Sequence, residues 1–171
     1  SFNFMFGDNF KLTSIDVSKW NTKNIKTIRG MFHDCRVLPT IGDVSKWNTS
    51  NMIDISSWLS NCESFIANDG VLDLSNWNTA KAIGMNDMFN GCSKLTKINI
   101  SKFDTSAVSD KAWEGTDDSD GIFYIHGNGM KSMFANCPKL KEIIVGSKWN
   151  TTGKTTTDMF TNCGVSNVTK K

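Results

Sequence analysis

The chain has 171 residues, of which 39% are hydrophobic and 21% charged. Its 19 basic and 17 acidic residues leave a formal net charge of +2 at pH 7, so overall charge gives no reason to expect nucleic acid or an anionic membrane as a partner. No run of about 18 apolar residues occurs, and the sequence therefore predicts no transmembrane segment.

One motif recurs from near the start of the chain to near its end. Its clearest copy runs from Met31 to Thr49, and another well-kept copy runs from Met88 to Thr105. Self-similarity with a period of roughly 20–50 residues is typical of repeat arrays. We therefore expect a single array over residues 1–171, and a fragment of a longer protein because both ends break off inside the motif. The copies begin at Met5, Met31, Trp58, Met88, Met133 and Met159.

Each copy carries an apolar pattern that predicts one short strand. Leu-x-x-Ile-x-Val ends with a period of two and is too short for an amphipathic helix, whereas the preceding Met-Phe-x-x-Cys-x-x-Leu has the spacing of a turn or 3₁₀ segment. One strand per roughly 26 residues cannot bury its own apolar face, so we expect successive copies to stack in parallel. The predicted fold is a repeat solenoid, a leucine-rich-repeat-like right-handed coil with little helix. The strand pieces are Leu12/Ile15/Val17, Leu38/Ile41/Val44, Phe65/Leu72/Leu74, Leu95/Ile98/Ile100 and Leu140/Ile143/Val145.

Two insertions break the period, one at about 66–70 and a larger one at about 109–131. Insertions in repeat proteins map to loops and are often where binding specificity lies. The larger insertion has a second interpretation as a degenerate copy, in which Trp113 takes the place of the first Met. The sequence leaves both interpretations open.

Cysteine occurs at one fixed position in the motif, four residues after its first residue. This placement predicts a buried column of free thiols that act as small apolar side chains. Neighbouring strands lie about 5 Å apart, so distance alone does not exclude a disulfide between adjacent copies. The paired Cys-x-x-Cys spacing of a zinc site is absent. The column comprises Cys35, Cys62, Cys92, Cys137 and Cys163, with Asn9 in the first copy.

An aromatic residue followed by a short polar one closes each copy. We interpret the aromatic row as stacked rings inside the array, because a carbohydrate platform would need exposed rings. We expect the polar side chains to bond to the backbone of the adjacent copy. The aromatic row is Trp20, Trp47, Trp77, Phe103 and Trp149, and the polar row is Asn21, Asn48, Asn78, Asp104 and Asn150.

A row of short polar residues lies at the outward position of the strand pieces and is the first candidate for ligand binding. Like charges in a row are unfavourable unless they are solvated or compensated. The row is therefore either a solvated ladder, with a basic row nearby, or a site for a cation or cationic partner. It comprises Asp16, Asp43, Asp73 and Asn99, and Ile144 ends it. The basic row comprises Lys19, Lys46, Lys102 and Lys148, interrupted by Asn76.

The larger insertion supplies the second set of candidate ligand-binding residues, Asp117, Asp118, Asp120 and Tyr124. The acidic cluster fails the calcium-loop pattern, because Gly127 stands where that loop needs Glu. His126 beside the cluster is a weak hint of a metal site, and His33 occupies a variable surface position. No motif of a hydrolase, phosphate-binding loop or metalloprotease occurs, so we expect no enzyme activity, no cofactor and no metal.

The motif Met-Phe-x-x-Cys-x-x-Leu-x-x-Ile-x-Val-Ser-x-Trp-Asn-Thr resembles the bacterial surface protein 26-residue repeat. This is a BspA-like leucine-rich repeat found in surface proteins and lipoproteins of mycoplasmas, lactobacilli and related bacteria. The resemblance runs from Met5 to Cys163, apart from the two insertions. It implies a cell-surface or secreted location and a role in adhesion or protein binding. It carries over no site, because the shared residues are those of the core.

The expected function is a non-catalytic binding array that recognises a host or microbial surface protein, or a glycan, through the strand face and the inserted loop. A solenoid presents an extended surface whose outward residues vary without disturbing the core. The alternative is a structural spacer with no ligand of its own. A β-solenoid hydrolase is the third possibility, and the spread of acids at one per copy counts against it.

Overall fold

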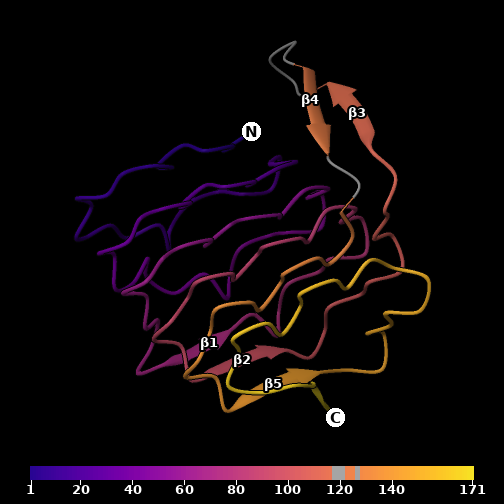
Figure 1. Cartoon of the computed structure of the whole chain (residues 1–171). Helices are drawn as coiled ribbons and strands as arrows, with labels where there is room; N and C mark the ends of the chain where they lie inside the picture. The colour runs from indigo at the N-terminus through magenta and orange to yellow at the C-terminus, as the bar shows by residue number, and fades with distance from the viewer. Residues whose placement is uncertain (117–121, 126–127) are drawn as a thin grey trace.

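The computed structural model describes residues 1–116, 122–125 and 128–171. In Figure 1 the chain runs back and forth in successive layers, from the indigo N-terminal layers to the yellow C-terminal ones. The described residues contain short strands and turns but no helix, and hence none with the length and hydropathy that crossing a bilayer requires. The strands are β1 (Val71–Asp73), β2 (Lys97–Ile100), β3 (Trp113–Thr116), β4 (Ile122–Ile125), β5 (Glu142–Val145) and β6 (Thr169–Lys170).

Four of the strands form a parallel sheet in the order β1-β2-β5-β6. The register aligns Leu72 with Ile98 and Ile98 with Ile143, which are equivalent positions in the motif. All three side chains are buried, as the alternation of apolar and polar residues predicts. β1, β2 and β5 lie side by side in Figure 1.

The expectation of one strand in every copy is wrong for the first two copies. Residues 12–17 and 38–44 form no strand, although the N–H of Val17 donates to the carbonyl of Ile41 at 3.0 Å. Pro39 has no N–H to donate, and Gly42, at a φ of 83°, adds a residue between Ile41 and Val44. Both features interrupt a regular ladder. Conversely, β6 adds a strand after Cys163, where the sequence lacks the expected Leu and Ile.

A second set of backbone hydrogen bonds joins the copies around their Met-Phe segments. The N–H groups of Ile28, Gly30, Phe32 and Asp34 donate to carbonyls of the following copy at 2.8–3.1 Å. The same alternating pattern links each successive pair of copies. Two positions in each copy adopt a positive φ, the residue before the first motif residue and the one three after it. The second of these is occupied by Asp8, Asp34, Asn61, Gly91, Asn136 and Asn162, the residue types that best tolerate a left-handed conformation.

The interior is one apolar cluster in which equivalent side chains lie next to each other. Phe6 stacks on Phe32 at 5.5 Å, and Phe89 stacks on Phe134 at 5.8 Å. All five cysteines are free, and Cys163 alone is not fully buried. Each of the other four thiols donates to a carbonyl of the preceding copy at 3.0–3.2 Å. These four are Cys35, Cys62, Cys92 and Cys137.

The larger insertion contains an antiparallel hairpin, β3–β4, that projects from the layered body (Figure 1). β2 pairs directly with β5, and the N–H of Phe89 donates to the carbonyl of Met133 at 3.0 Å. No additional copy therefore separates these two copies, which rules out the interpretation of the insertion as a degenerate copy with Trp113 at its start. Trp113 instead begins the hairpin and pairs with Ile125.

Candidate functional site

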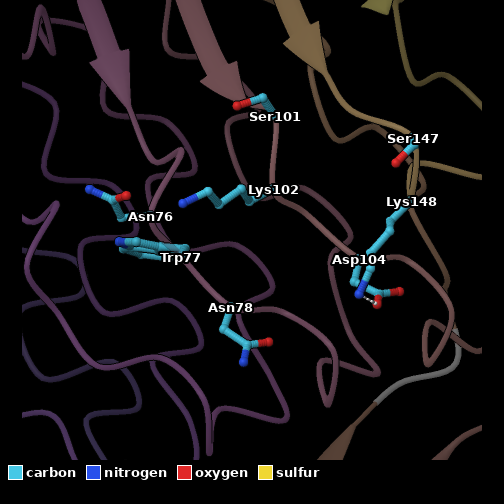
Figure 2. Close-up of a pocket in the computed structure, with 8 residues that line it drawn as sticks. All are labelled: Asn76, Trp77, Asn78, Ser101, Lys102, Asp104, Ser147 and Lys148. Carbon is cyan, nitrogen blue, oxygen red and sulfur yellow. Dashed lines mark hydrogen bonds and ion pairs between the residues drawn. The ribbon is translucent and has the colours of Figure 1, made fainter. Parts of the chain in front are cut away.

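The candidate site is a polar hollow of about 430 Å³ beyond the carboxyl ends of β1, β2 and β5. Three motif copies contribute to it through the same stretch, the residues that follow each strand. Figure 2 shows these side chains arranged around the hollow. They are Asn76, Trp77 and Asn78 from the first of these copies, Ser101, Lys102 and Asp104 from the second, and Ser147 and Lys148 from the third.

Aromatic stacking beneath the hollow holds its walls in place. Trp77 and Phe103, at equivalent motif positions, stack with ring centroids 6.5 Å apart and planes 12° apart. The indole N–H of Trp77 donates to the carbonyl of Val44 at 3.0 Å, and both rings are fully buried. A ligand in the hollow would therefore meet mainly amide, hydroxyl, carboxylate and ammonium groups and not an aromatic face.

The two lysines of the hollow differ in their partners. Lys148 is 3.0 Å from Oδ2 of Asp104, whereas Lys102 has no ion-pair partner among the described residues and extends toward Asn76 in Figure 2. Hydrogen bonds from Ser106, and then the ammonium of Lys148, lower the pKa of Asp104 to about 2. The hollow thus offers one free cation beside a neutralised carboxylate and several hydrogen-bonding groups.

The acidic row that the sequence analysis proposed for ligand binding, Asp16, Asp43, Asp73 and Asn99, does not line this hollow. Each of its side chains accepts a hydrogen bond from the N–H two residues later, at 2.9–3.2 Å, and so stabilises the turn after its own strand piece. Hydrogen bonds from the hydroxyl and the N–H of Ser18 lower the pKa of Asp16, and those from the N–H and the hydroxyl of Ser45 lower the pKa of Asp43. Asp43 and Asp73 line a separate hollow of about 220 Å³. Ile144, the last position of the row, is buried.

The candidate ligand-binding residues of the larger insertion do not line either hollow among the described residues. Asp117, Asp118, Asp120 and His126 lie outside the described residues. The backbone of Tyr124 is in β4, paired with Glu114.

The recurring Asn and Asp of the polar row bond differently from the prediction. Their side-chain oxygens accept N–H groups of their own copy, two residues on, at 2.9–3.1 Å. The neighbouring copy is reached instead by the Thr that follows each of them. Thr79, for example, donates to the carbonyl of Asp104 and accepts from its N–H. Sequence reasoning missed this role, although the recurrence of Thr after Asn was visible. Thr49 and Thr105 form the same bridge, and Thr22 donates to the carbonyl of Asn48 in the same way.

One group of three described side chains has the composition and proximity to hold a metal ion. Asp8, His33 and Asp34 come from the first two motif copies and do not contribute to the hollow of Figure 2. Sequence reasoning did not bring them together, because it treated His33 as a variable surface residue.

In a comparison with known families, the chain matches the family described as "Mycoplasma protein of unknown function, DUF285". It matches residues 1–71, 39–113 and 126–169, and so extends over nearly the whole chain. Searches of curated proteins and of solved structures gave no match.

Proposed function

The chain belongs to the family of Mycoplasma proteins known as DUF285, and from this starting point we propose that it is a non-catalytic binding module of a bacterial cell surface. Its ligand would be a protein or glycan that presents polar groups to the hollow of Figure 2. The observation that carries the proposal is the convergence of polar side chains from three motif copies on one hollow. The cell-surface location rests on the resemblance to BspA-like repeats.

We further propose that the copies form one continuous solenoid. The same backbone hydrogen bonds recur between successive copies, and equivalent aromatic rings stack within 12° of parallel at Trp47–Trp77 and Trp77–Phe103. Such a body orients surface side chains rigidly while the shared core carries the stability. Preorganised side chains lose less conformational freedom when a ligand binds.

The chemistry of the hollow favours a hydrated, hydrogen-bonding ligand. Asn76, Asn78, Ser101 and Ser147 supply both donors and acceptors, and the ammonium of Lys102 is left to meet an acceptor or an anionic group. A catalytic role for the cysteines is disfavoured because burial raises the pKa of each of them, and the thiolate is the reactive form.

A spacer without a ligand is the second candidate, and the outward strand residues favour it. The acidic row is uniform, and each side chain in it caps its own turn. A surface made of such residues gives a partner little to distinguish one copy from the next. The spacer and the binding module therefore differ in whether the hollow binds anything.

A glycan and matrix-protein array separates the two candidates. We would probe it with the wild-type chain, with Lys102→Ala and with Lys46→Ala. Lys46 is a matched control because it is exposed, occupies the motif position of Lys102 and does not line the hollow. Loss of a signal with Lys102→Ala alone would support recognition at the hollow. No signal from the wild-type chain would favour the spacer.

A fourth probe tests the inserted hairpin as the recognition element. Residues 113–127 would be replaced by a short Gly-Ser linker, which closes readily because Trp113 pairs with Ile125 at the base of the hairpin. The variant retains the hydrogen bonds that anchor the insertion, which the N–H of Thr155 donates to the carboxylate of Asp110 and the N–H of Ser109 donates to the carbonyl of Ile83. A signal lost with this variant but kept in Lys102→Ala would move the proposed site from the hollow to the hairpin.

A further inference from the structure

We propose that Asp8, His33 and Asp34 form a binding site for a divalent transition-metal ion, with Zn²⁺ as the test ion. Each residue offers one ligand atom, and the three atoms all lie within 4.8 Å of one another. One imidazole nitrogen with two carboxylate oxygens is a donor set that Zn²⁺ accepts, and it leaves a coordination position for water. This site is independent of the hollow and of the proposed function.

The stacking of two motif copies creates the site. Asp8 and Asp34 hold the same position in successive copies, and both adopt a left-handed conformation, with φ of 60° and 57°. The N–H of Asp8 donates to the carbonyl of His33 at 2.8 Å, which fixes the first copy against the second at this point. The repeat geometry therefore brings two carboxylates close together, although they are far apart in the sequence.

His33 presents a single nitrogen to the carboxylates. Its Nε2 lies 2.8 Å from Oδ2 of Asp34, whereas its Nδ1 is buried and has no hydrogen-bond partner among the described residues. The ring of Phe4 lies edge-to-face against the imidazole, with centroids 6.1 Å apart, and limits its rotation. The side chain of His33 remains 29% exposed, so the imidazole is in contact with solvent.

Arg36 orients the buried carboxylate without occupying both of its oxygens. Its Nε and one terminal nitrogen bond to Oδ1 of Asp34 at 2.9 and 2.8 Å, and Oδ2 faces Nε2 of His33, with the side-chain amide of Asn61 3.5 Å away. In many metal sites, a residue that does not contact the metal orients a metal ligand by hydrogen bonds, as Arg36 orients Asp34 here. Asp8 is exposed and can adjust its rotamer to complete the site. No other copy repeats the arrangement, because the positions equivalent to His33 are Gly7, Ser60, Asn90, Ala135 and Thr161.

The competing explanation is a plain ion pair between protonated His33 and Asp34. The ion pair predicts no saturable binding of Zn²⁺, whereas the metal site predicts binding, for which His33 must give up a proton to become a ligand. Isothermal titration of the full chain with Zn²⁺, after chelator treatment and with thiols kept reduced, should give saturable binding of about one equivalent. His33→Ala and Asp8→Asn should each weaken it at least about tenfold, the lower limit for loss of even an outer-sphere partner.

His126→Ala is the matched control, because His126 is the other of the two histidines in the sequence. This variant should bind Zn²⁺ like the wild type. Imidazole NMR signals of the unmodified chain give a readout that needs no variant, and those of one histidine should shift saturably with Zn²⁺. The proposal is overturned if the wild type shows no saturable binding or if binding survives in His33→Ala. A thiolate-to-metal absorption band with Co²⁺ would also overturn it, since it would place the ion on a cysteine.

Discussion

The contrast between Trp58 and Trp77 gives the sharpest test of how hydrogen bonds between copies contribute to stability. Both indoles are fully buried, and their rings lie 4.8 Å apart. The N–H of Trp77 donates to Val44, whereas the N–H of Trp58 has no partner among the described residues. The same substitution, Trp→Phe, therefore removes a satisfied donor at one site and an unsatisfied donor at the other.

Trp77→Phe should destabilise the chain by about 2 kcal/mol. Replacing an indole by a phenyl ring loses roughly 40 Å² of buried area, or about 1 kcal/mol, and the lost hydrogen bond adds about 1 kcal/mol. Steric misfit should add little, because Phe103 occupies the equivalent position in the next copy. Trp58→Phe loses the same area but relieves a buried unsatisfied donor, which costs about 1–3 kcal/mol. Its net effect should lie between zero and about 2 kcal/mol of added stability.

Urea denaturation followed by circular dichroism would measure both variants under identical conditions. Because the two rings touch, both substitutions report on the same region even if unfolding of the array is not fully two-state. The expected gap in unfolding free energy is at least about 2 kcal/mol. If Trp58→Phe were as destabilising as Trp77→Phe, the assignment of hydrogen bonds to these two indoles would be refuted.

Three further predictions concern backbone strain, acid stability and thiol access. Gly153→Ala should lower the free energy of unfolding by about 1–2 kcal/mol, because a φ of 70° disfavours a side chain, although no described atom lies within 4 Å of the added Cβ. Gly91→Ala should lower it more, because a Cβ there would lie 3.1 Å from the Cα of Asn61. Urea denaturation measures both. Asp104→Asn should lower the free energy of unfolding slightly at pH 7. The variant should also lose less stability than the wild type between about pH 4 and pH 2, as measured by denaturation across pH. Native alkylation followed by mass spectrometry should modify Cys163 alone.

The sign of the acid prediction follows from the lowered pKa of Asp104. A carboxyl group whose pKa is lower in the folded state contributes stability above its unfolded pKa of about 4, and this contribution disappears as pH falls through the folded pKa of about 2. An unchanged acid profile in Asp104→Asn would contradict the lowered pKa that the hydrogen bonds from Ser106 and the ion pair with Lys148 give Asp104. Equal costs at Gly91 and Gly153 would contradict the close approach to Asn61, and labelling of two or more native thiols would contradict their burial.

The parallel pairing of β1, β2 and β5 could be predicted because apolar residues alternate at Leu72, Ile98 and Ile143 in equivalent positions. The free cysteines, four of them buried, could be predicted from the recurrence of Cys at one fixed position in five of the six copies. These features depend on residue types that most copies share. They were therefore readable from one sequence.

The remaining features depend on backbone conformation or on contacts between unlike residues. The left-handed positions occupied by Asp34 and Gly91 left only a weak signal, a preference for Asp, Asn and Gly three residues after the first motif residue. β6 contains Thr169 and Lys170, which lack the apolar alternation that marks the other strands of the sheet. The hollow joins Asn76, Lys102 and Lys148, which hold one motif position in three copies; the spacing predicts that they are neighbours but does not show that the surface between them is hollow.

Hydrogen bonds between copies explain why the residues that recur at the same position in successive copies do not indicate what this chain binds. The hydroxyl of Thr79, the indole N–H of Trp77 and the thiol of Cys92 each donate to a backbone carbonyl of an adjacent copy. A side chain whose polar group is already satisfied inside the array has little left to offer a partner. Recognition must then come from side chains that form no such bond to an adjacent copy. Lys102 and His33 are two of these among the described residues, and changing either should alter binding far more than stability.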